Sequence, residues 1–476
     1  MLVRLSSASL LLTGWLLTGC AHVQSLPKAD PTVPSFPPLP GQSDTLVGVA
    51  LSGGGSRAAY FGAAGLEALA RVRVSASEPS LLQRVSYLSS VSGGSVASSY
   101  FAARKPSADV AVLNAQGSLS PAYRKFFDEY RATMGKNIQR SMEWRQLWNG
   151  RWFNSTKRAT SLAETLDAHF LKQLTFEQLY ERERKGDSPR LILNATLYNN
   201  GRRFAMTTVP RDDFRYDFIR KLEGELNAKS PKPKPLPKSL AIAREALNPL
   251  TFQDHGADFR AIPVSRAVAA SASFPFFIGP ITAQVEGEET YLHVGDGGLF
   301  DNQGTESLAQ LFLKKLEDGK AKRALVIAFD SSFPFWVKNS RLDQLENGFN
   351  IFVKDTGRIV GIMEQRANAY QSMVWHILQS QNIVLPDDAT IKVIVLRHTD
   401  EDAWPENPQS VLPEACRHEA SKLATKQQMR EWLALIPTKF KLTSDCDKAL
   451  LRETAVRVVE RNKEEIVSFL RGEKER

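Results

Sequence analysis

Several features that commonly reveal a protein's chemistry are missing from this sequence. Its 476 residues include only three cysteines, and the spacings H-E-x-x-H and C-x-x-C that typically hold a metal ion do not occur. No internal repeat is evident. The apolar run at residues 10–17 is too short to span a bilayer. We therefore expect neither a metal ion nor a cofactor.

What is present is an ordinary globular composition with an excess of positive charge. Hydrophobic residues make up 42% of the chain and charged residues 24%, so it can bury a large core and is not disordered throughout. The net charge is +9, which favours an anionic partner or surface but does not identify it.

The start of the chain has the pattern of an exported protein. One positive charge, the apolar run and a small residue before Cys20 predict a signal peptide over residues 1–19. The segment "LTGC", ending at Cys20, resembles a bacterial lipobox, which implies that Cys20 is acylated and anchors the protein to a membrane. By the same resemblance, Ala21 implies transport to the outer membrane. Proline-rich residues 25–41 predict an extended tether, so residues 20–44 would join the lipid to the first strand.

Alternating strand and helix patterns predict an α/β domain over residues 45–400. Short apolar runs at 46–51, 85–91, 191–197 and 324–329 read as buried strands, and residues 61–70 and 95–103 read as helices between them. This alternation predicts a largely parallel sheet. The proline-rich basic segment 227–239 must be a loop, either solvated or in contact with a membrane. Residues 401–476 predict a helical extension.

Two cysteines remain in that extension, Cys416 and Cys446. An oxidising compartment would permit them to form a disulfide, but two buried free thiols would leave the same sequence. Both alternatives stay open.

A loop of three consecutive glycines, "LVGVALSGGGSRAAYFG" at residues 46–62, lies between a predicted strand and a predicted helix. It lacks the G-x-x-x-x-G-K-[ST] and G-x-G-x-x-G patterns of nucleotide-binding loops. Successive backbone N–H groups at a helix N-terminus also suit a transient oxyanion. We interpret the loop as an oxyanion hole, which requires a nucleophile elsewhere.

A second turn supplies that nucleophile. In "SSVSGGSVASS", Ser92 directly follows a predicted strand and precedes two glycines, as a nucleophile elbow requires. A competing frame would use Ser95, but Ser95 falls inside the predicted helix. Further along, Asp296 begins the tight glycine turn of "HVGDGGLFDNQG" and provides an acid.

Together these motifs resemble those of patatin-like phospholipases. The glycine loop with Arg57, the Ser92 elbow, "LILNATLYNNGRRFAM", "AVAASASFPFFIGPI" and the Asp296 turn follow one another in the order of that family, over roughly residues 46–330. The resemblance implies a three-layer α/β fold with a mostly parallel sheet flanked by helices. It also implies lipid acyl hydrolysis by a Ser-Asp dyad without histidine.

Carried over position by position, the resemblance gives each residue a role. Ser92 corresponds to the nucleophile, Asp296 to its general base and Arg57 to the residue that braces the loop. The backbone N–H groups of three glycines correspond to the oxyanion hole: Gly53, Gly54 and Gly55. The implied substrate is a membrane lipid, and we expect no nucleic-acid partner.

Some features leave alternatives open. Ser90 stands where the elbow usually has glycine, and Ala58 where glycine often follows the arginine. Ser90 keeps a second function possible, a catalytically inactive lipid-binding or envelope-organising lipoprotein. His293 lies near Asp296 in sequence and could suggest a histidine triad, although a strand residue without a catalytic role is the preferred interpretation. The aromatic residues at 274–277 could line an acyl-chain pocket or belong to the core.

Overall fold

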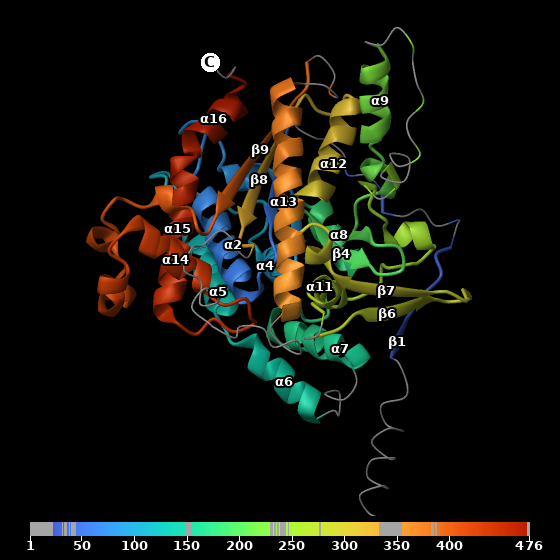
Figure 1. Ribbon diagram of the computed structural model, residues 1–476, viewed down its shortest axis with the longest axis horizontal. Coiled ribbons are helices and arrows are strands. Elements are labelled where there is room, and N and C mark those ends of the chain that lie inside the picture. Colours follow the sequence, from blue (N-terminus) through green and yellow to red (C-terminus); the bar gives the residue numbers. More distant parts are fainter. Residues whose placement is uncertain are drawn as a thin grey trace, which may run out of the picture.

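A single mixed sheet with helices on both faces forms the centre of the computed structural model (Figure 1). The structure describes residues 22–30, 44–148, 155–228, 247–275, 278–332, 355–381 and 388–473, with a few single residues and pairs between these ranges. The strands are β1 (Val23–Leu26), β2 (Thr45–Leu51), β3 (Val85–Val91), β4 (Arg190–Leu197), β5 (Arg202–Thr207), β6 (Ile281–Val285), β7 (Tyr291–Asp296), β8 (Arg323–Asp330) and β9 (Thr390–Arg397).

The sheet is mostly parallel, as the sequence predicts. Its order is β1-β6-β7-β4-β3-β2-β8-β9, and β5 pairs with β4 outside this path. The central pairings of β2 with β3 and β8, of β3 with β4 and of β8 with β9 are all parallel. In contrast, β7 runs antiparallel to β4 and β6. The four strands predicted from apolar runs agree with β2, β3, β4 and β8 to within one residue at each end.

Both faces of the central strands are buried, which explains why these strands are apolar runs without polar alternation. Along β8, Leu325, Ile327 and Phe329 pack into one core and Ala324, Val326 and Ala328 into another. The first core includes residues of α2 and α4, and the second includes residues of α12 and α13. The protein therefore has the three layers expected of its fold.

The helices come from most of the length of the chain, and several of them cover the sheet. They are α2 (Gly55–Leu69), α3 (Leu81–Arg84), α4 (Gly93–Arg104), α5 (Pro121–Met134), α6 (Ile138–Trp148), α7 (Ser155–Leu166), α8 (Phe176–Arg184), α9 (Phe218–Ala228), α11 (Val264–Ser271), α12 (Thr305–Glu317), α13 (Asp355–Gln381), α14 (Lys426–Leu435), α15 (Asp445–Arg461) and α16 (Lys463–Arg471). Because β2 and β3 are parallel, the loops that lead from their carboxyl ends into α2 and α4 lie side by side.

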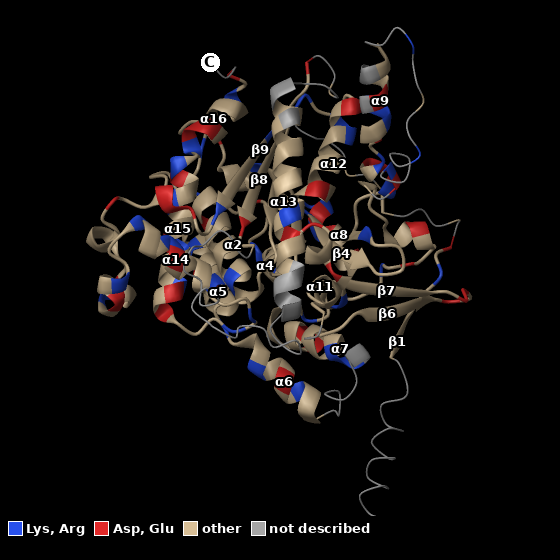
Figure 2. Cartoon of the chain, in the orientation of Figure 1, with Lys and Arg blue, Asp and Glu red and all other residues tan. Residues whose placement is uncertain are grey.

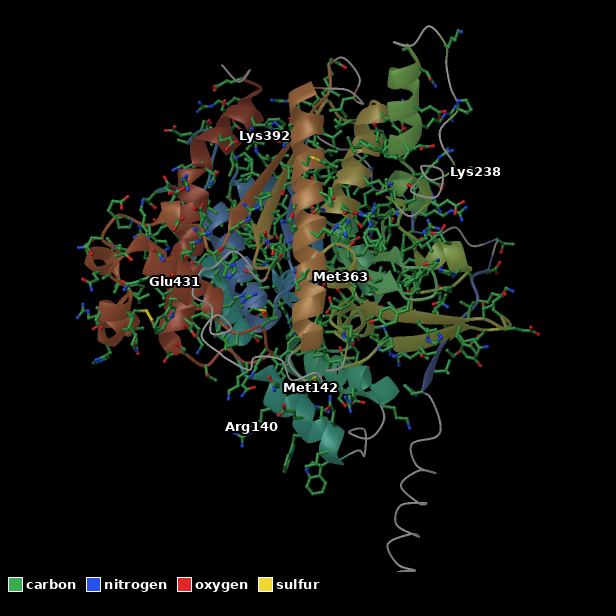
Figure 3. All side chains as sticks on the ribbon, in the orientation of Figure 1. Arg140, Met142, Lys238, Met363, Lys392 and Glu431 are labelled. Carbon is green, nitrogen blue, oxygen red and sulfur yellow. A yellow bond between two sulfur atoms is a disulfide. The ribbon has the colours of Figure 1, made fainter. Side chains whose placement is uncertain are left out.

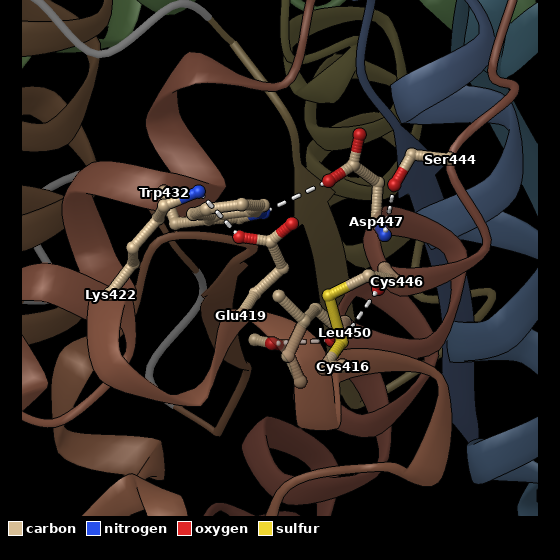
Figure 4. The surroundings of a disulfide bond; sticks show 9 residues. Cys416, Glu419, Lys422, Trp432, Ser444, Cys446, Asp447 and Leu450 are labelled. Atoms are coloured by element: carbon tan, nitrogen blue, oxygen red, sulfur yellow. Dashed lines mark hydrogen bonds and ion pairs between the residues drawn. A yellow bond between two sulfur atoms is a disulfide. The ribbon is translucent and has the colours of Figure 1, made fainter.

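The C-terminal extension packs against the domain and is closed by a disulfide. Cys416 and Cys446 are joined, which settles the alternative that the sequence left open (Figure 4). Nearby, the indole N–H of Trp432 donates a hydrogen bond of 2.9 Å to Asp447. The disulfide thus connects the segment before α14 to the start of α15. The short connection that contains Ile436 lies between these two helices.

The sheet begins earlier than the sequence predicts. Residues 23–26, expected in the tether, form β1 and pair in parallel with β6 at the edge of the sheet. The peptide N–H of Asp258 also donates to the carbonyl of Pro27 at 2.7 Å. A proline-rich segment can still supply an edge strand where its own prolines lie outside the ladder. Cys20 and most of segment 227–239 lie outside the described residues.

Candidate active site

Ser92 sits at a strained turn between β3 and α4. Its φ is +52°, a left-handed conformation that few residues other than glycine adopt. Two glycines allow the turn to pack this closely. A Cβ at Gly93 would lie 2.0 Å from the carbonyl oxygen of Gly55, and one at Gly94 would lie 2.2 Å from that of Leu51. The Ser92 elbow and the glycine loop are therefore in direct contact.

The competing serine has a different environment. Ser95 is fully buried in α4, and its hydroxyl lies 2.8 Å from the hydroxyl of Ser271. The Ser90 hydroxyl is also in the interior, 2.7 Å from that of Ser98, so the serine at the elbow's glycine position is accommodated by a buried polar pair. Of the two candidate frames, only the Ser92 frame places its serine at the turn.

Asp296 ends β7 beside this elbow. Burial raises the pKa of its carboxyl to about 7, and hydrogen bonding from the Gly298 N–H and the Ser92 hydroxyl opposes that rise. Oδ1 accepts the Gly298 N–H at 2.8 Å. Oδ2 is buried and has no hydrogen-bond partner within the described part of the chain. The Ser92 hydroxyl is thus close enough to act on the carboxyl, which retains a free acceptor atom.

The glycine loop offers two free amides rather than three. The N–H of Gly53 donates to the carbonyl of Asn302 at 2.9 Å. The N–H groups of Gly54 and Gly55 have no hydrogen-bond partner among the described residues. Both have positive φ, +136° and +61°. A Cβ at Gly53 would lie 3.5 Å from that of Ser92, so the loop passes directly beside the elbow.

Arg57, in the first turn of α2, fixes the position of the glycine loop. Its buried guanidinium donates hydrogen bonds of 2.7 Å to the carbonyls of Ser331 and Ile436. Burial lowers the pKa of Arg57 to about 10, and the charges of Asp330 and Glu364 act in the opposite direction. Arg57 therefore joins the loop to the end of β8 and to the C-terminal extension.

Residues that the sequence analysis did not identify complete the surroundings. Ser271, on α11, accepts the Ser92 N–H at 3.1 Å and donates its hydroxyl to the carbonyl of Asn194 at 2.6 Å. The side-chain amide of Asn302 donates to Glu364 of α13 at 3.2 Å. Burial and repulsion by Asp296 and Asp330 raise the pKa of Glu364 to about 8. The carboxyl of Glu364 thus lies at the site together with those of Asp296 and Asp330.

The remaining candidates lie elsewhere. Nδ1 of His293 lies 3.1 Å from the Thr282 hydroxyl on β6, and no contact joins this ring to Ser92 among the described residues. Phe274 is described, but the aromatic residues at 276 and 277 are not, so an acyl-chain pocket at this segment stays a prediction. Within the described ranges, no cluster of His, Cys, Asp or Glu could hold a metal ion, and no helix is long and apolar enough to cross a membrane.

Comparison with known proteins identifies the class. The profile of the patatin-like phospholipase family matches residues 49–309, more than half of the chain. The protein belongs to the patatin-like phospholipase family. That match covers the glycine loop, the Ser92 elbow and the Asp296 turn and excludes Glu364 and the C-terminal extension. No curated protein matches the chain.

Solved structures show distant likeness only. Human GIVD cytosolic phospholipase A2 aligns with a TM-score of 0.44 and 12% identity, over 90% of this chain and 60% of that one. The same human enzyme in complex with methyl gamma-linolenyl fluorophosphonate aligns with a TM-score of 0.43 and 15% identity, over 91% and 60%. The chain thus spans about three fifths of the length of these structures.

Proposed function

We propose that this protein is a serine hydrolase that cleaves acyl ester bonds of membrane lipids, as a phospholipase A or a lysophospholipase. Membership of the family supports lipid acyl hydrolysis. The observation that carries the finer proposal is the strained Ser92 beside a buried carboxyl whose pKa is raised to about 7. A carboxylate with that pKa can accept a serine proton near neutral pH, which an ordinary exposed aspartate does poorly.

The proposed reaction has two steps. Oγ of Ser92 attacks the ester carbonyl carbon while its proton passes to Oδ2 of Asp296, the carboxylate oxygen that has no hydrogen-bond partner among the described residues. Collapse of the tetrahedral intermediate expels the alcohol, which takes the proton from Asp296. Water then attacks the acyl carbonyl carbon and passes a proton to Asp296. When this second tetrahedral intermediate collapses, the bond to Oγ of Ser92 breaks, Oγ takes the proton back from Asp296, and the fatty acid leaves.

The free amides of the glycine loop would stabilise the negative charge that develops in both steps. We assign this role to the N–H groups of Gly54 and Gly55, since that of Gly53 already donates to Asn302. This assignment narrows the three-glycine oxyanion hole predicted from the sequence. Arg57 would act as a positioning residue through its bonds to Ser331 and Ile436.

Hydrolysis of a soluble short-chain p-nitrophenyl ester tests the proposal. Wild type should turn the ester over, and a fluorophosphonate should label Ser92 and abolish turnover. An intact, correctly folded protein that neither hydrolyses esters nor reacts with the fluorophosphonate would instead be the inactive lipid-binding lipoprotein considered above.

We also propose that acylated Cys20 anchors the protein to the bacterial outer membrane. Support comes from "LTGC" and the proline-rich segment that follows it. A Cys20→Ser chain should lose labelling by radioactive palmitate and leave the detergent phase on partitioning. Equal palmitate labelling of Cys20→Ser and wild type would contradict the anchor.

A further inference from the structure

The most exposed apolar side chains of this protein gather on a few elements. Among the described residues, eight large apolar side chains are more than half exposed. Four lie on α13, three on α6 and one, Leu435, at the end of α14. Scattered exposed apolar residues are ordinary, but a concentration of this kind marks an interaction surface.

The four on α13 form one stripe. Ile362, Met363, Tyr370 and Met373 are exposed, and their spacing places them on one face of the helix. The opposite face carries Gln371, Trp375 and Leu378, which are buried against the domain. A helix packed on one side usually presents polar residues to water on the other. Here the large exposed side chains are mainly apolar, and Figure 3 shows the labelled Met363 on this helix.

The three on α6 form a second stripe. Trp144, Leu147 and Trp148 are between 60% and 72% exposed and have the spacing of one helix face. The two tryptophan rings pack edge to face, with centroids 5.6 Å apart. Met142 lies on the buried face of the same helix. Tryptophan is enriched where apolar and polar surroundings meet, as at a membrane surface.

Both helices are tied to the candidate active site. Glu364, next to Met363 on α13, accepts the Asn302 amide at 3.2 Å. At the start of α6, the N–H of Gln139 donates to the carbonyl of Phe440 at 3.0 Å, and the preceding Lys439 carbonyl accepts the N–H of Ser56 at 2.7 Å. Thus α13 contacts the Asp296 side of the site and α6 is linked to the glycine loop.

The exposed charges on α6, on α13 and in the connection at residues 436–444 are mainly positive, and Glu143 on α6 is the exposed acid among the residues described there. Arg366 lies within the α13 stripe, where its guanidinium stacks on the Tyr370 ring at 5.7 Å. Lys439 and Lys441, in the connection that contacts the glycine loop, are exposed, as is Arg140 on α6. The carboxyl of Glu364 faces the site. Figure 2 shows α13 as largely uncharged along its described length.

We infer that these apolar stripes and the cations among them dock the protein on an anionic lipid surface, with the active site held at that surface. Apolar side chains would enter the region below the headgroups, while the arginines and lysines would contact lipid phosphates. The inference rests on the proposed function for its substrate, since docking would bring lipid esters to Ser92. It is separate from the anchor at Cys20, which tethers the chain without orienting it.

Vesicle binding tests the inference. The full chain with Cys20→Ser, which removes the proposed acyl group, should co-sediment with vesicles of phosphatidylcholine and phosphatidylglycerol, and more weakly with phosphatidylcholine alone. In that chain, Ile362→Ser with Met363→Ser, and separately Trp144→Ser with Trp148→Ser, should weaken binding at least tenfold. Tyr291→Ser is the matched control, because Tyr291 is exposed but lies at the far end of β7 from Asp296. Its binding should not change.

Two further measurements separate the possible failures. The docking variants should hydrolyse a soluble ester within about twofold of the parent chain while losing at least tenfold on vesicle lipids. If vesicle binding and hydrolysis are unchanged in both double variants, the docking surface is wrong. If the variants instead convert a lipid-free dimer to a monomer by light scattering, the stripes bind a second copy and the inference is overturned. If no ester is hydrolysed at all, the proposed function fails, while the binding result still decides the docking surface.

Discussion

Arg57 donates a hydrogen bond of 2.7 Å to the backbone carbonyl of Ile436, which lies in the C-terminal extension, outside the segment that matches the family. The same guanidinium bonds to Ser331 at the end of β8. A third link, from the N–H of Ser56 to the carbonyl of Lys439, adds to this contact. The extension is therefore part of the support of the glycine loop and not an appendage.

Replacing Arg57 by methionine should weaken the fold and the site together. Two buried carbonyls would lose their donor, which costs about 1–3 kcal/mol each, and turnover of a soluble ester should fall as the loop loosens. Urea unfolding and ester assays measure the two effects. Arg71→Met is the control, because Arg71 lies just beyond the C-terminal end of the same helix, is exposed and pairs with Glu67 at 3.1 Å. It should change the free energy of unfolding by less than about 1 kcal/mol.

Gly54→Ala should abolish most of the turnover. At φ +136° an alanine is strained, and its Cβ would lie 2.7 Å from the carbonyl oxygen of Ser331. Loss or displacement of one oxyanion donor lowers turnover by about a hundredfold or more. Gly201→Ala is the control, since Gly201 also has positive φ but no atom within 4 Å of an added Cβ. Near-normal ester hydrolysis by a folded Gly54→Ala would mean that the loop has only a packing role.

Ser92→Ala and Asp296→Asn should each lower turnover by about a thousandfold or more, and the double variant should lose little beyond either single one. The two residues act as one unit, so their effects are not additive. His293→Gln should be mild, because the His293 ring contacts Thr282. Steady-state assays on one ester, with circular dichroism to confirm folding, make the comparison. A large loss in His293→Gln alongside an active Asp296→Asn would replace the dyad with a histidine triad.

The sequence predicts the central strands and the two turns well because each has a local cause. Buried parallel strands need apolar runs, and the turn at Ser92 needs Gly93 and Gly94. Contacts made by backbone groups leave no such pattern. Nothing in the sequence shows that the Gly53 N–H is taken by Asn302 or that the Ile436 carbonyl accepts from Arg57, because any residue supplies those groups.

The sequence does not identify Glu364, for a related reason. It is one of two acidic residues in a 27-residue helix, and only the packing of α13 against the domain turns it toward Asn302. The early start of the sheet at β1 has the same origin, since a short edge strand depends on the partner strand β6 more than on its own sequence. The sequence likewise does not decide the disulfide, because pairing depends on the distance between two helical segments.

The raised pKa of Asp296 predicts opposite pH effects on activity and stability. Hydrolysis of a soluble ester needs the carboxylate, so turnover should rise with pH through about 7. Stability runs the other way. Between the ordinary aspartate pKa near 4 and about 7, the unfolded chain has released a proton that the folded chain still holds, so this residue lowers the free energy of unfolding as pH rises. Asp296→Asn, which cannot ionise, should therefore be more stable than wild type at pH 8, by about 2–4 kcal/mol, and nearly equal to it at pH 4. Urea unfolding at the two pH values measures this difference.

Glu364→Gln is the control for the activity profile. Its amide imitates the neutral carboxyl that prevails below about pH 8, so the rise in turnover near pH 7 should remain. If that rise disappears in Glu364→Gln, it belongs to Glu364 and the assignment of the base to Asp296 loses its support.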